Sequence, residues 1–327
     1  MKRLIAGGFV LSLFCLTASA GTLAGTLYYT LYTGGQNVWS VGYQYDGTNF
    51  TLSTPTNIAS TDGADGIIFA PNGDLLIGGQ YSGQVHQITT AGVPVTDAAT
   101  GGGGSFHLAL DPSGTKVYTS NFGGALATLP ISGGQIQNGT THALTGDDYG
   151  VTGEAFTPSS GAFYVNGQPN GGGNVGLLNL STFTTTQLFS GITSAHGMVY
   201  DPFTSLLTLF GRGAVGTFDP TNTGAGVKER FGITGDFDQG AVDGQGHALI
   251  AGDSSITFID YSASGDITSA LNPTFVVGGF NGIDDVAPLT GLGSNSTPEP
   301  ASLLLALSGL LAVVGVRARR KSPARRA

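Results

Sequence analysis

One segment form recurs along this chain, and its spacing constrains the fold more than any other feature. Each copy has a short apolar strand, a turn with Pro or Gly, and a second apolar strand. Five copies begin at Gly66, His107, Gly153, His196 and Gly240. Aligned on one apolar position, Phe69, Leu110, Phe156, Tyr200 and Val242 are 41, 46, 44 and 42 residues apart, and Val286 follows 44 residues later. The repeat therefore predicts six structural units.

Each copy continues into a third apolar strand, as in GQVHQIT after the first copy and SSITFIDY after the fifth. A period in the low forties with three or four strands per unit is typical of a β-propeller blade. Solenoids of β-coils have shorter periods, and arrays of helices need a helical periodicity that this sequence lacks. The 55 glycines and the 10% content of charged residues fit short strands joined by tight turns. We predict an all-β, six-bladed β-propeller over residues 21–290.

The sixth blade is divided between the two ends of this region. Near the C-terminus, GIDDVAPL supplies an inner strand and then stops. Near the N-terminus, residues 26–32 and 37–43 resemble the second and third strands of a blade. Pairing these segments in one sheet would close the ring and remove its open strand edges. We therefore expect N- and C-terminal strands to share the closing blade.

Residues 1–20 have the pattern of a secretory signal peptide. Lys2 and Arg3 precede an apolar stretch over residues 4–16, and Ala18 and Ala20 form an A-x-A cleavage site. This pattern predicts export across the inner membrane and cleavage by signal peptidase. Because Cys15, the only cysteine, lies in this leader, the mature protein would have neither disulfides nor thiol chemistry.

The C-terminal end predicts a second targeting element. Residues 291–297 read as a flexible linker, and Pro298, Glu299 and Pro300 precede the apolar segment 301–316. As a helix this segment spans about 24 Å, slightly short of a hydrocarbon core of about 30 Å. Basic residues follow at once, which places that end in the cytoplasm. The nearest of them are Arg317, Arg319, Arg320 and Lys321.

This order of motif, apolar span and basic cluster over residues 298–327 closely resembles the PEP-CTERM sorting signal of Gram-negative bacteria. The resemblance implies recognition by an exosortase, a transient membrane anchor, and release to the cell surface or the extracellular space. It also suggests a link to exopolysaccharide or biofilm. The propeller region resembles the YVTN, NHL and gluconolactonase-like superfamily, most clearly at FHLALDPSGTKVYTSNFGGALATLPI, residues 106–131. Blade motifs of this kind specify fold more than chemistry.

The charge of the mature region limits the classes of partner that we expect it to bind. Without the leader and the basic tail it keeps four Lys and Arg residues against 21 carboxylates, counting Glu299. Such a surface repels phosphate backbones, so we expect no nucleic-acid partner. Divalent cations, exopolysaccharide and envelope proteins fit this charge, although acidity also serves to keep an exported protein soluble.

Six ionisable residues mark the start of the inner strand in each blade, where a propeller lines its central channel. Their offsets from the aligned apolar position are −4, −3, −2, −4, −4 and −2, so all but His107 share a strand phase. Together they could hold Ca²⁺ or another divalent metal. The alternative is that they cap strands and bind neighbouring backbone. The residues are Asp65, His107, Glu154, His196, Asp238 and Asp284.

Two functions are compatible with this sequence. The first, which the sequence favours, is an exported surface or matrix protein whose propeller is a binding and structural module without enzymatic activity. The second is a metal-dependent extracellular hydrolase or lyase acting on a lactone or glycan. No Ser-His-Asp or Cys-His set is recognisable. A tight cluster of three or more channel ligands beside a pocket would favour the second function.

Overall fold

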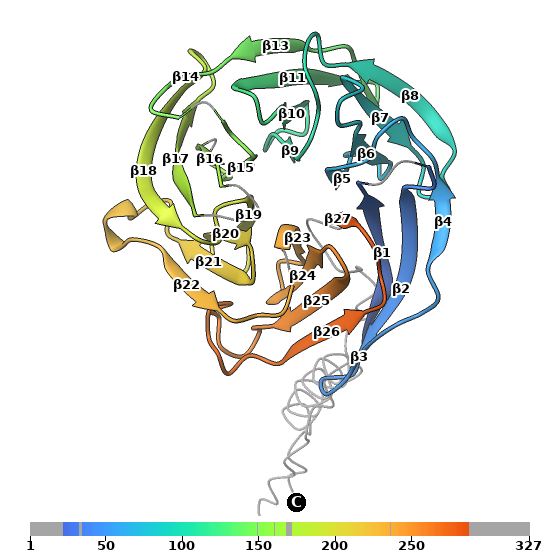
Figure 1. Ribbon diagram of the computed structural model, residues 1–327, viewed down its shortest axis with the longest axis vertical. Helices are drawn as coiled ribbons and strands as arrows, with labels where there is room; N and C mark the ends of the chain where they lie inside the picture. Colours follow the sequence, from blue (N-terminus) through green and yellow to red (C-terminus); the bar gives the residue numbers. More distant parts are fainter. Residues whose placement is uncertain are drawn as a thin grey trace, which may run out of the picture. The chain divides into compact units, whose positions relative to one another are not determined.

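The computed structural model describes residues 22–287, apart from residues 33–34, 149, 160, 168–171 and 236. In this part of the chain, six sheets surround a central axis as the blades of a ring (Figure 1). The only helical turn among the described residues is a 3-10 helix, η1 (Thr223–Ala225). The prediction of an all-β, six-bladed propeller is therefore confirmed.

We number five blades in chain order and name the sixth the closing blade. The first contains β5 (Ile67–Phe69), β6 (Leu75–Gly78), β7 (Gln84–Ile88) and β8 (Pro94–Ala99). The second contains β9 (Leu108–Leu110), β10 (Lys116–Ser120), β11 (Ala125–Ser132), β12 (Gln135–Ile136) and β13 (Thr140–Ala143). The third contains β14 (Thr145–Gly146), β15 (Gly153–Phe156), β16 (Ala162–Val165), β17 (Gly173–Asn179) and β18 (Thr184–Ile192).

The two remaining blades of the numbered series have four strands each. The fourth contains β19 (Gly197–Asp201), β20 (Leu206–Gly211), β21 (Ala214–Phe218) and β22 (Lys228–Phe231). The fifth contains β23 (Phe237–Val242), β24 (His247–Gly252), β25 (Ser255–Asp260) and β26 (Thr274–Gly278). All six aligned apolar positions of the repeat lie in the innermost strands, which are β5, β9, β15, β19, β23 and β27.

The closing blade joins the two ends of the propeller. It contains β27 (Ile283–Ala287), β1 (Leu23–Leu31), β2 (Val38–Tyr45), β3 (Phe50–Leu52) and β4 (Thr56–Ala59). The C-terminal β27 is innermost and pairs antiparallel with β1, with Tyr29 opposite Val286. The N-terminal strands thus occupy the second and third positions of the blade, as the sequence predicts.

The blades are held together by apolar side chains between neighbouring sheets. Leu27 and Val286 in the closing blade are fully buried in one cluster with Ile256 of the fifth blade. Burying such a side chain contributes roughly 1.5–3 kcal/mol. Because both faces of a sheet are covered in this way, each blade depends on its two neighbours.

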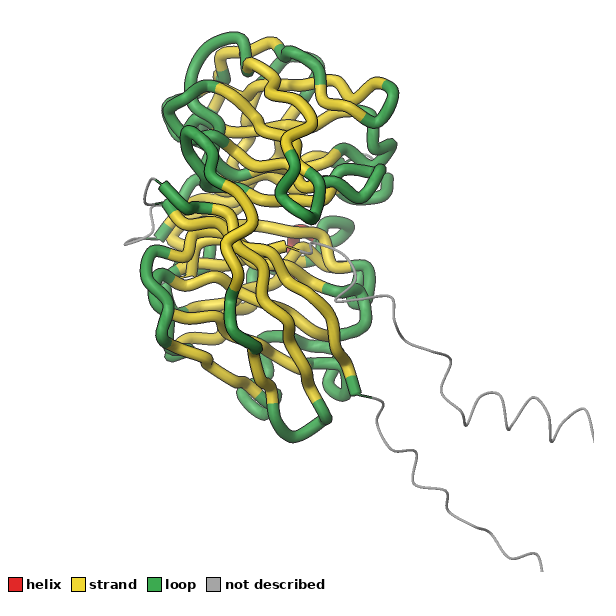
Figure 2. Tube along the Cα trace, turned by 90° about the vertical axis from the view of Figure 1, so that its right-hand side faces the viewer, coloured by secondary structure: helices red, strands yellow, loops and turns green. Residues whose placement is uncertain are grey.

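The topology gathers one set of loops at one end of the channel. Each innermost strand starts at this end, the second strand runs back to it, and the third leaves it, because neighbouring strands are antiparallel. In the side view the strands run through the ring and the loops lie at its faces (Figure 2). The turns between second and third strands therefore border the same channel mouth as the starts of the inner strands.

Several predictions concern residues that lie outside the described part of the chain. These are the signal peptide at 1–20, propeller residues 288–290, the linker at 291–297 and the sorting signal at 298–327. Within the described residues, no helix has the length and hydropathy needed to span a membrane.

Candidate functional site

The six ionisable residues singled out in the sequence come from six different blades and sit at one channel mouth. Asp65, His107 and His196 directly precede or nearly precede their inner strands, whereas Glu154, Asp238 and Asp284 lie within theirs. Five of these side chains are buried, and Asp238 keeps 22% of its side-chain surface exposed. The group is thus sealed from solvent except on the side of the fifth blade.

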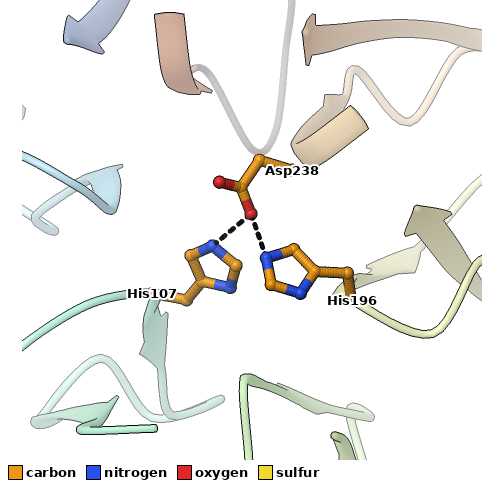
Figure 3. A group of neighbouring side chains, drawn as sticks. All are labelled: His107, His196 and Asp238. Atoms are coloured by element: carbon orange, nitrogen blue, oxygen red, sulfur yellow. Dashed lines mark hydrogen bonds and ion pairs between the residues drawn. The ribbon is translucent and has the colours of Figure 1, made fainter. Parts of the chain in front are cut away.

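Three of the six side chains meet at one point (Figure 3). The Nε2 atom of His107 lies 3.0 Å from Oδ1 of Asp238, and Nε2 of His196 contacts that same oxygen. One nitrogen of each ring and a carboxylate oxygen all lie within 4.8 Å of one another. Two imidazoles and one carboxylate form a ligand set that suits Zn²⁺, Mn²⁺, Co²⁺ or Fe²⁺.

The hydrogen bond between His196 and Gly167 turns the other ring nitrogen of His196 towards Asp238. The Nδ1 atom of His196 lies 2.6 Å from the carbonyl oxygen of Gly167, so Nδ1 carries the proton and donates it to that carbonyl. In a neutral ring, Nε2 would then present a lone pair to the Asp238 carboxylate, and two lone pairs repel. A proton on Nε2 or a metal ion between the two atoms removes this repulsion.

A metal ion between these ligands needs them to move apart. Ligands about 2.0–2.1 Å from a tetrahedral ion lie roughly 3.3–3.4 Å apart. The oxygen of Asp238 is 3.0 Å from the His107 nitrogen and closer than that to the His196 nitrogen, so it must move away from both rings, and further from His196 than from His107, before an ion fits. Asp238 is the most exposed of the three side chains, which makes it the ligand that moves.

His107 also faces a group of buried acids. Its Nε2 lies 3.6 Å from Oδ1 of Asp285 and 3.9 Å from Oδ1 of Asp65. The carboxyl group of Asp284 in turn shares hydrogen bonds with Asp65 and Asp238. Sequence reasoning missed Asp285, although it stands directly beside Asp284 in GIDDVAPL.

The carboxyl groups and imidazoles of the cluster shift one another's pKa values. Burial alone lowers the pKa of His107, but the carboxylates of Asp285, Asp238 and Asp65 outweigh it and raise this pKa to about 10. Burial alone raises the pKa of Asp238, but His196 and His107 hold it well below its ordinary value. Burial raises the pKa values of Asp284 and Asp285 well above the ordinary range. Without a metal ion, the cluster therefore holds protons in place of cations.

Glu154 belongs to neither of these groups. It is 2% exposed, and neither of its carboxyl oxygens has a hydrogen-bond partner. Burial raises its pKa to about 8, against a smaller opposing effect of His107. At neutral pH it is therefore mostly a neutral acid in the wall of the channel.

The alternation of side chains along the inner strands does not decide which residues join the cluster. His107 has an odd offset and still meets His196 and Asp238, because it lies ahead of β9, where strand alternation does not apply. Asp284 and Asp285 are adjacent in β27, yet both reach the cluster. An inner strand presents its edge to the channel, so side chains from both of its faces can contribute.

Two turns in the left-handed backbone region support the site. Gln80, in the turn after β6, has φ +51 and donates from Nε2 to Oδ2 of Asp65 at 3.4 Å. Phe122, in the turn after β10, has φ +55, and its ring centroid lies 5.4 Å from that of His107 and 5.9 Å from that of His196. A residue other than Gly pays conformational energy at such angles, which is common near functional sites.

An aromatic series links the histidines to an open hollow. Phe122 stacks on Phe106 with centroids 4.4 Å apart, and Tyr81 meets Phe106 edge-on at 5.3 Å. Tyr81 is 89% exposed. It borders a hollow of about 610 Å³ that is otherwise lined by Ser82, Gly83 and residues 99–104. The site thus has an apolar wall on one side and a solvent-facing recess beyond it.

Comparison with known proteins supports the fold. The periplasmic gluconolactonase of Pseudomonas aeruginosa has a similar structure, with a TM-score of 0.56 and 12% identity, over 81% of this chain and 98% of that one. A streptogramin B lyase gives 0.50 and 12%, over 67% and 69%. Virginiamycin B lyase from Staphylococcus aureus gives 0.49 and 11%, over 79% and 89%. The gluconolactonase and the streptogramin B lyase share the propeller fold with this chain. No family model and no curated protein matches the sequence.

Proposed function

We propose that this chain is a metal-dependent hydrolase or lyase built on a six-bladed propeller, acting outside the cell on a lactone or glycan. The observation that carries the proposal is the convergence of the His107 and His196 Nε2 atoms on one oxygen of Asp238. The sequence favoured a binding module over an enzyme. A tight cluster of three ligands beside a recess is the feature that would favour the enzyme instead. Such a cluster is present, and a recess lies beyond the rings of Phe122, Phe106 and Tyr81 that adjoin it.

The chain's own residues prepare this site for a metal ion. Gly167 fixes the ring of His196 so that Nε2 faces the cluster, a common arrangement for metal-binding histidines. Phe122 covers both rings and limits access of water from its side. An ion held by these ligands would activate a water molecule or polarise a carbonyl group.

The same arrangement suggests where a substrate lies. Asp238 is the exposed ligand, and the aromatic series from Phe122 to Tyr81 leads to the recess at residues 99–104. Sugars and ring lactones have apolar faces that pack against aromatic side chains, and they carry oxygens that bind polar groups. The recess is lined by the backbone of residues 99–104 and by Ser82, whose hydroxyl can make such a contact.

A second candidate is the non-enzymatic module, which the exposed ring of Tyr81 beside the recess favours. In that case the propeller binds exopolysaccharide or an envelope protein through this face. Export by the leader and sorting by an exosortase, as the sequence predicts, belong to both candidates.

Metal titration tests the main proposal. Chelator-treated protein is titrated with Co²⁺ and followed by calorimetry and by visible absorption, which reports nitrogen ligation. We expect binding in the wild type and at least ~100-fold weaker binding in His196→Ala, since losing a ligand costs more than the 10–100-fold of an outer-shell change. His142→Ala is the control, because His142 stacks on Phe183 at the outer part of its blade.

Two results would overturn the proposal. One is the absence of Co²⁺ binding in the wild type, which would leave the binding module. The other is equal affinity in the wild type and His196→Ala. Where metal binds, hydrolysis or elimination is then measured on panels of lactones and glycans with and without the ion.

A further inference from the structure

The third blade supplies none of the three ligands, yet it lies between the blades that hold the two histidines. Its innermost strand, β15, has β9 of the second blade on one side and β19 of the fourth blade on the other (Figure 1). A Cβ atom added to Gly153, the first residue of β15, would lie 3.2 Å from the carbonyl oxygen of His196 and 3.5 Å from Nδ1 of His107. The backbone of the third blade therefore packs directly against both histidines.

Three hydrogen bonds tie the segment that carries His196 to the third blade. Thr152 donates from Oγ1 to the carbonyl oxygen of His196 at 2.8 Å. Gly167 donates its N–H to the carbonyl of Ala195 at 2.6 Å, and its own carbonyl accepts from Nδ1 of His196. Among these three bonds, the bond from Thr152 is the one that a side chain of the third blade supplies, so a substitution can remove it alone.

Thr152 is itself held by the second blade. Its carbonyl oxygen accepts a hydrogen bond from Oγ of Ser120, the last residue of β10, at 2.9 Å. The carbonyl of Ser120 in turn accepts from the N–H of Phe106, the residue before His107, at 3.1 Å. Ser120, Thr152 and His196 are 0%, 1% and 2% exposed, so solvent does not replace these bonds. A chain of buried hydrogen bonds thus runs from the neighbour of His107 to His196.

The surroundings of the Thr152 hydroxyl direct its proton to His196. Oγ1 also lies 3.3 Å from the carbonyl oxygen of Val165, but that carbonyl already accepts the backbone N–H of Thr152 at 2.8 Å. A hydroxyl donates one proton, and the contact with His196 is the shorter of the two. Without this donor the buried carbonyl of His196 loses its partner, which is costly. We therefore expect the segment of His196 to move when the hydroxyl is removed.

We propose that Thr152 is a positioning residue, which sets the separation of the two imidazole ligands by joining the second blade to the fourth. The ring centroids of His107 and His196 lie 5.2 Å apart, and both Nε2 atoms face one oxygen of Asp238. Metal–ligand distances vary by only about 0.2 Å, so a small displacement of one ring weakens binding. This role rests on the proposed function where it concerns metal affinity, whereas the positions of the rings can be tested without a metal ion.

The first test compares Co²⁺ binding in variants of the full protein. Thr152→Val removes the hydroxyl and keeps the shape of the side chain, and Thr152→Ser keeps the hydroxyl. Chelator-treated proteins are titrated with Co²⁺ and followed by calorimetry and visible absorption. We expect Thr152→Val to bind Co²⁺ at least ~10-fold more weakly, as for other outer-shell changes, and with altered absorption bands. Thr152→Ser should restore both the affinity and the bands of the wild type.

Thr208→Val is the matched control. Thr208 is 0% exposed in β20, in the same blade as His196, and its Oγ1 has no hydrogen-bond partner in the described part of the chain. The same substitution should therefore leave Co²⁺ affinity and absorption bands unchanged. Ser120→Ala is the second test variant, used if circular dichroism shows that Thr152→Val does not fold. It removes the donor to the Thr152 carbonyl and should also weaken Co²⁺ binding.

The second test needs no metal ion. Nitrogen–proton correlation spectra of the imidazoles report the tautomer and the Nδ1 hydrogen bond of each of the five histidines. In metal-free Thr152→Val the signals of His196 should shift, and in Thr152→Ser they should return to their wild-type positions. The signals of His142, which stacks on Phe183 in the outer part of the ring, should stay unchanged in both variants.

The outcomes separate the positioning role from the proposed function. If the wild type binds Co²⁺, and Thr152→Val keeps its affinity, bands and His196 signals, the positioning role is wrong and the proposed function stands. Equal weakening in Thr152→Ser and Thr152→Val also overturns the role, because the hydroxyl is then not what matters. If the wild type binds no Co²⁺, the proposed function fails. The role then stands if the His196 signals shift in Thr152→Val and return in Thr152→Ser, and it fails if they do not.

Discussion

Replacing Glu154 by Gln should stabilise the metal-free protein by an amount that grows with pH. Glu154 is buried without a hydrogen-bond partner, and its pKa is raised from 4.5 to about 8. Between these two values the folded protein keeps a proton that the unfolded chain has lost. The stability contributed by protonated Glu154 is therefore complete below pH 4.5 and is lost as pH rises towards 8. Gln cannot ionise, so the variant escapes this loss.

The size of the effect follows from the pKa shift. Each pH unit between the unfolded and folded pKa values costs about 1.4 kcal/mol. From about pH 5 to about pH 8.5, the advantage of Glu154→Gln over the wild type should grow by roughly 4 kcal/mol. For a domain of this size that corresponds to roughly 7 °C in melting temperature. A constant offset from the amide of Gln cancels in this comparison between two pH values.

Chemical denaturation of chelator-treated wild type and Glu154→Gln at both pH values measures this difference. Asp253→Asn is the control, because its exposed side chain should leave the pH dependence of unfolding unchanged. A difference between Glu154→Gln and wild type that stays constant with pH, within about 1 kcal/mol, would refute the reasoning. It would mean that Glu154 finds a solvent or cation partner.

Three further changes test the packing and the ends of the chain. Gly66→Ala should destabilise the folded protein by about 2 kcal/mol or more and weaken Co²⁺ binding, because backbone atoms of the next blade lie 2.4 and 2.9 Å from the added Cβ. The control in both denaturation and titration is Gly224→Ala, whose nearest neighbouring atom is 3.8 Å away. Leu27→Ala should cost about 2–5 kcal/mol by leaving a cavity in the closing blade, while Leu271→Ala, at a position 92% exposed, should cost little. Deleting residues 298–327 should leave export intact and change surface placement, and an unchanged distribution in cell fractions would contradict the sorting proposal.

The repeat made most of the fold predictable from the sequence. Phe69 to Val286 could be aligned because each inner strand needs an apolar residue at the same place between blades. The divided closing blade was also predictable, since GIDDVAPL lacks the strands that residues 26–32 and 37–43 supply. Breaks in outer strands, such as that between β12 and β13, leave no comparable periodic signal.

The site was only partly predictable, for a physical reason. The repeat placed six ionisable residues at one channel mouth, but strand phase wrongly set His107 apart. It also passed over Asp285, because alternation within a strand assigns neighbouring residues to opposite faces. Gln80 and Phe122 could not be found either, since their contacts with the cluster depend on turn geometry from another part of the blade.

The position of a bound ion tests the central claim most directly. X-ray diffraction data are collected at the cobalt absorption edge from crystals of the Co²⁺-loaded protein. We expect an anomalous peak about 2.0–2.2 Å from Nε2 of His107, Nε2 of His196 and a carboxylate oxygen of Asp238. No peak at this cluster at saturating Co²⁺, or a peak bound only by other residues, would contradict the account.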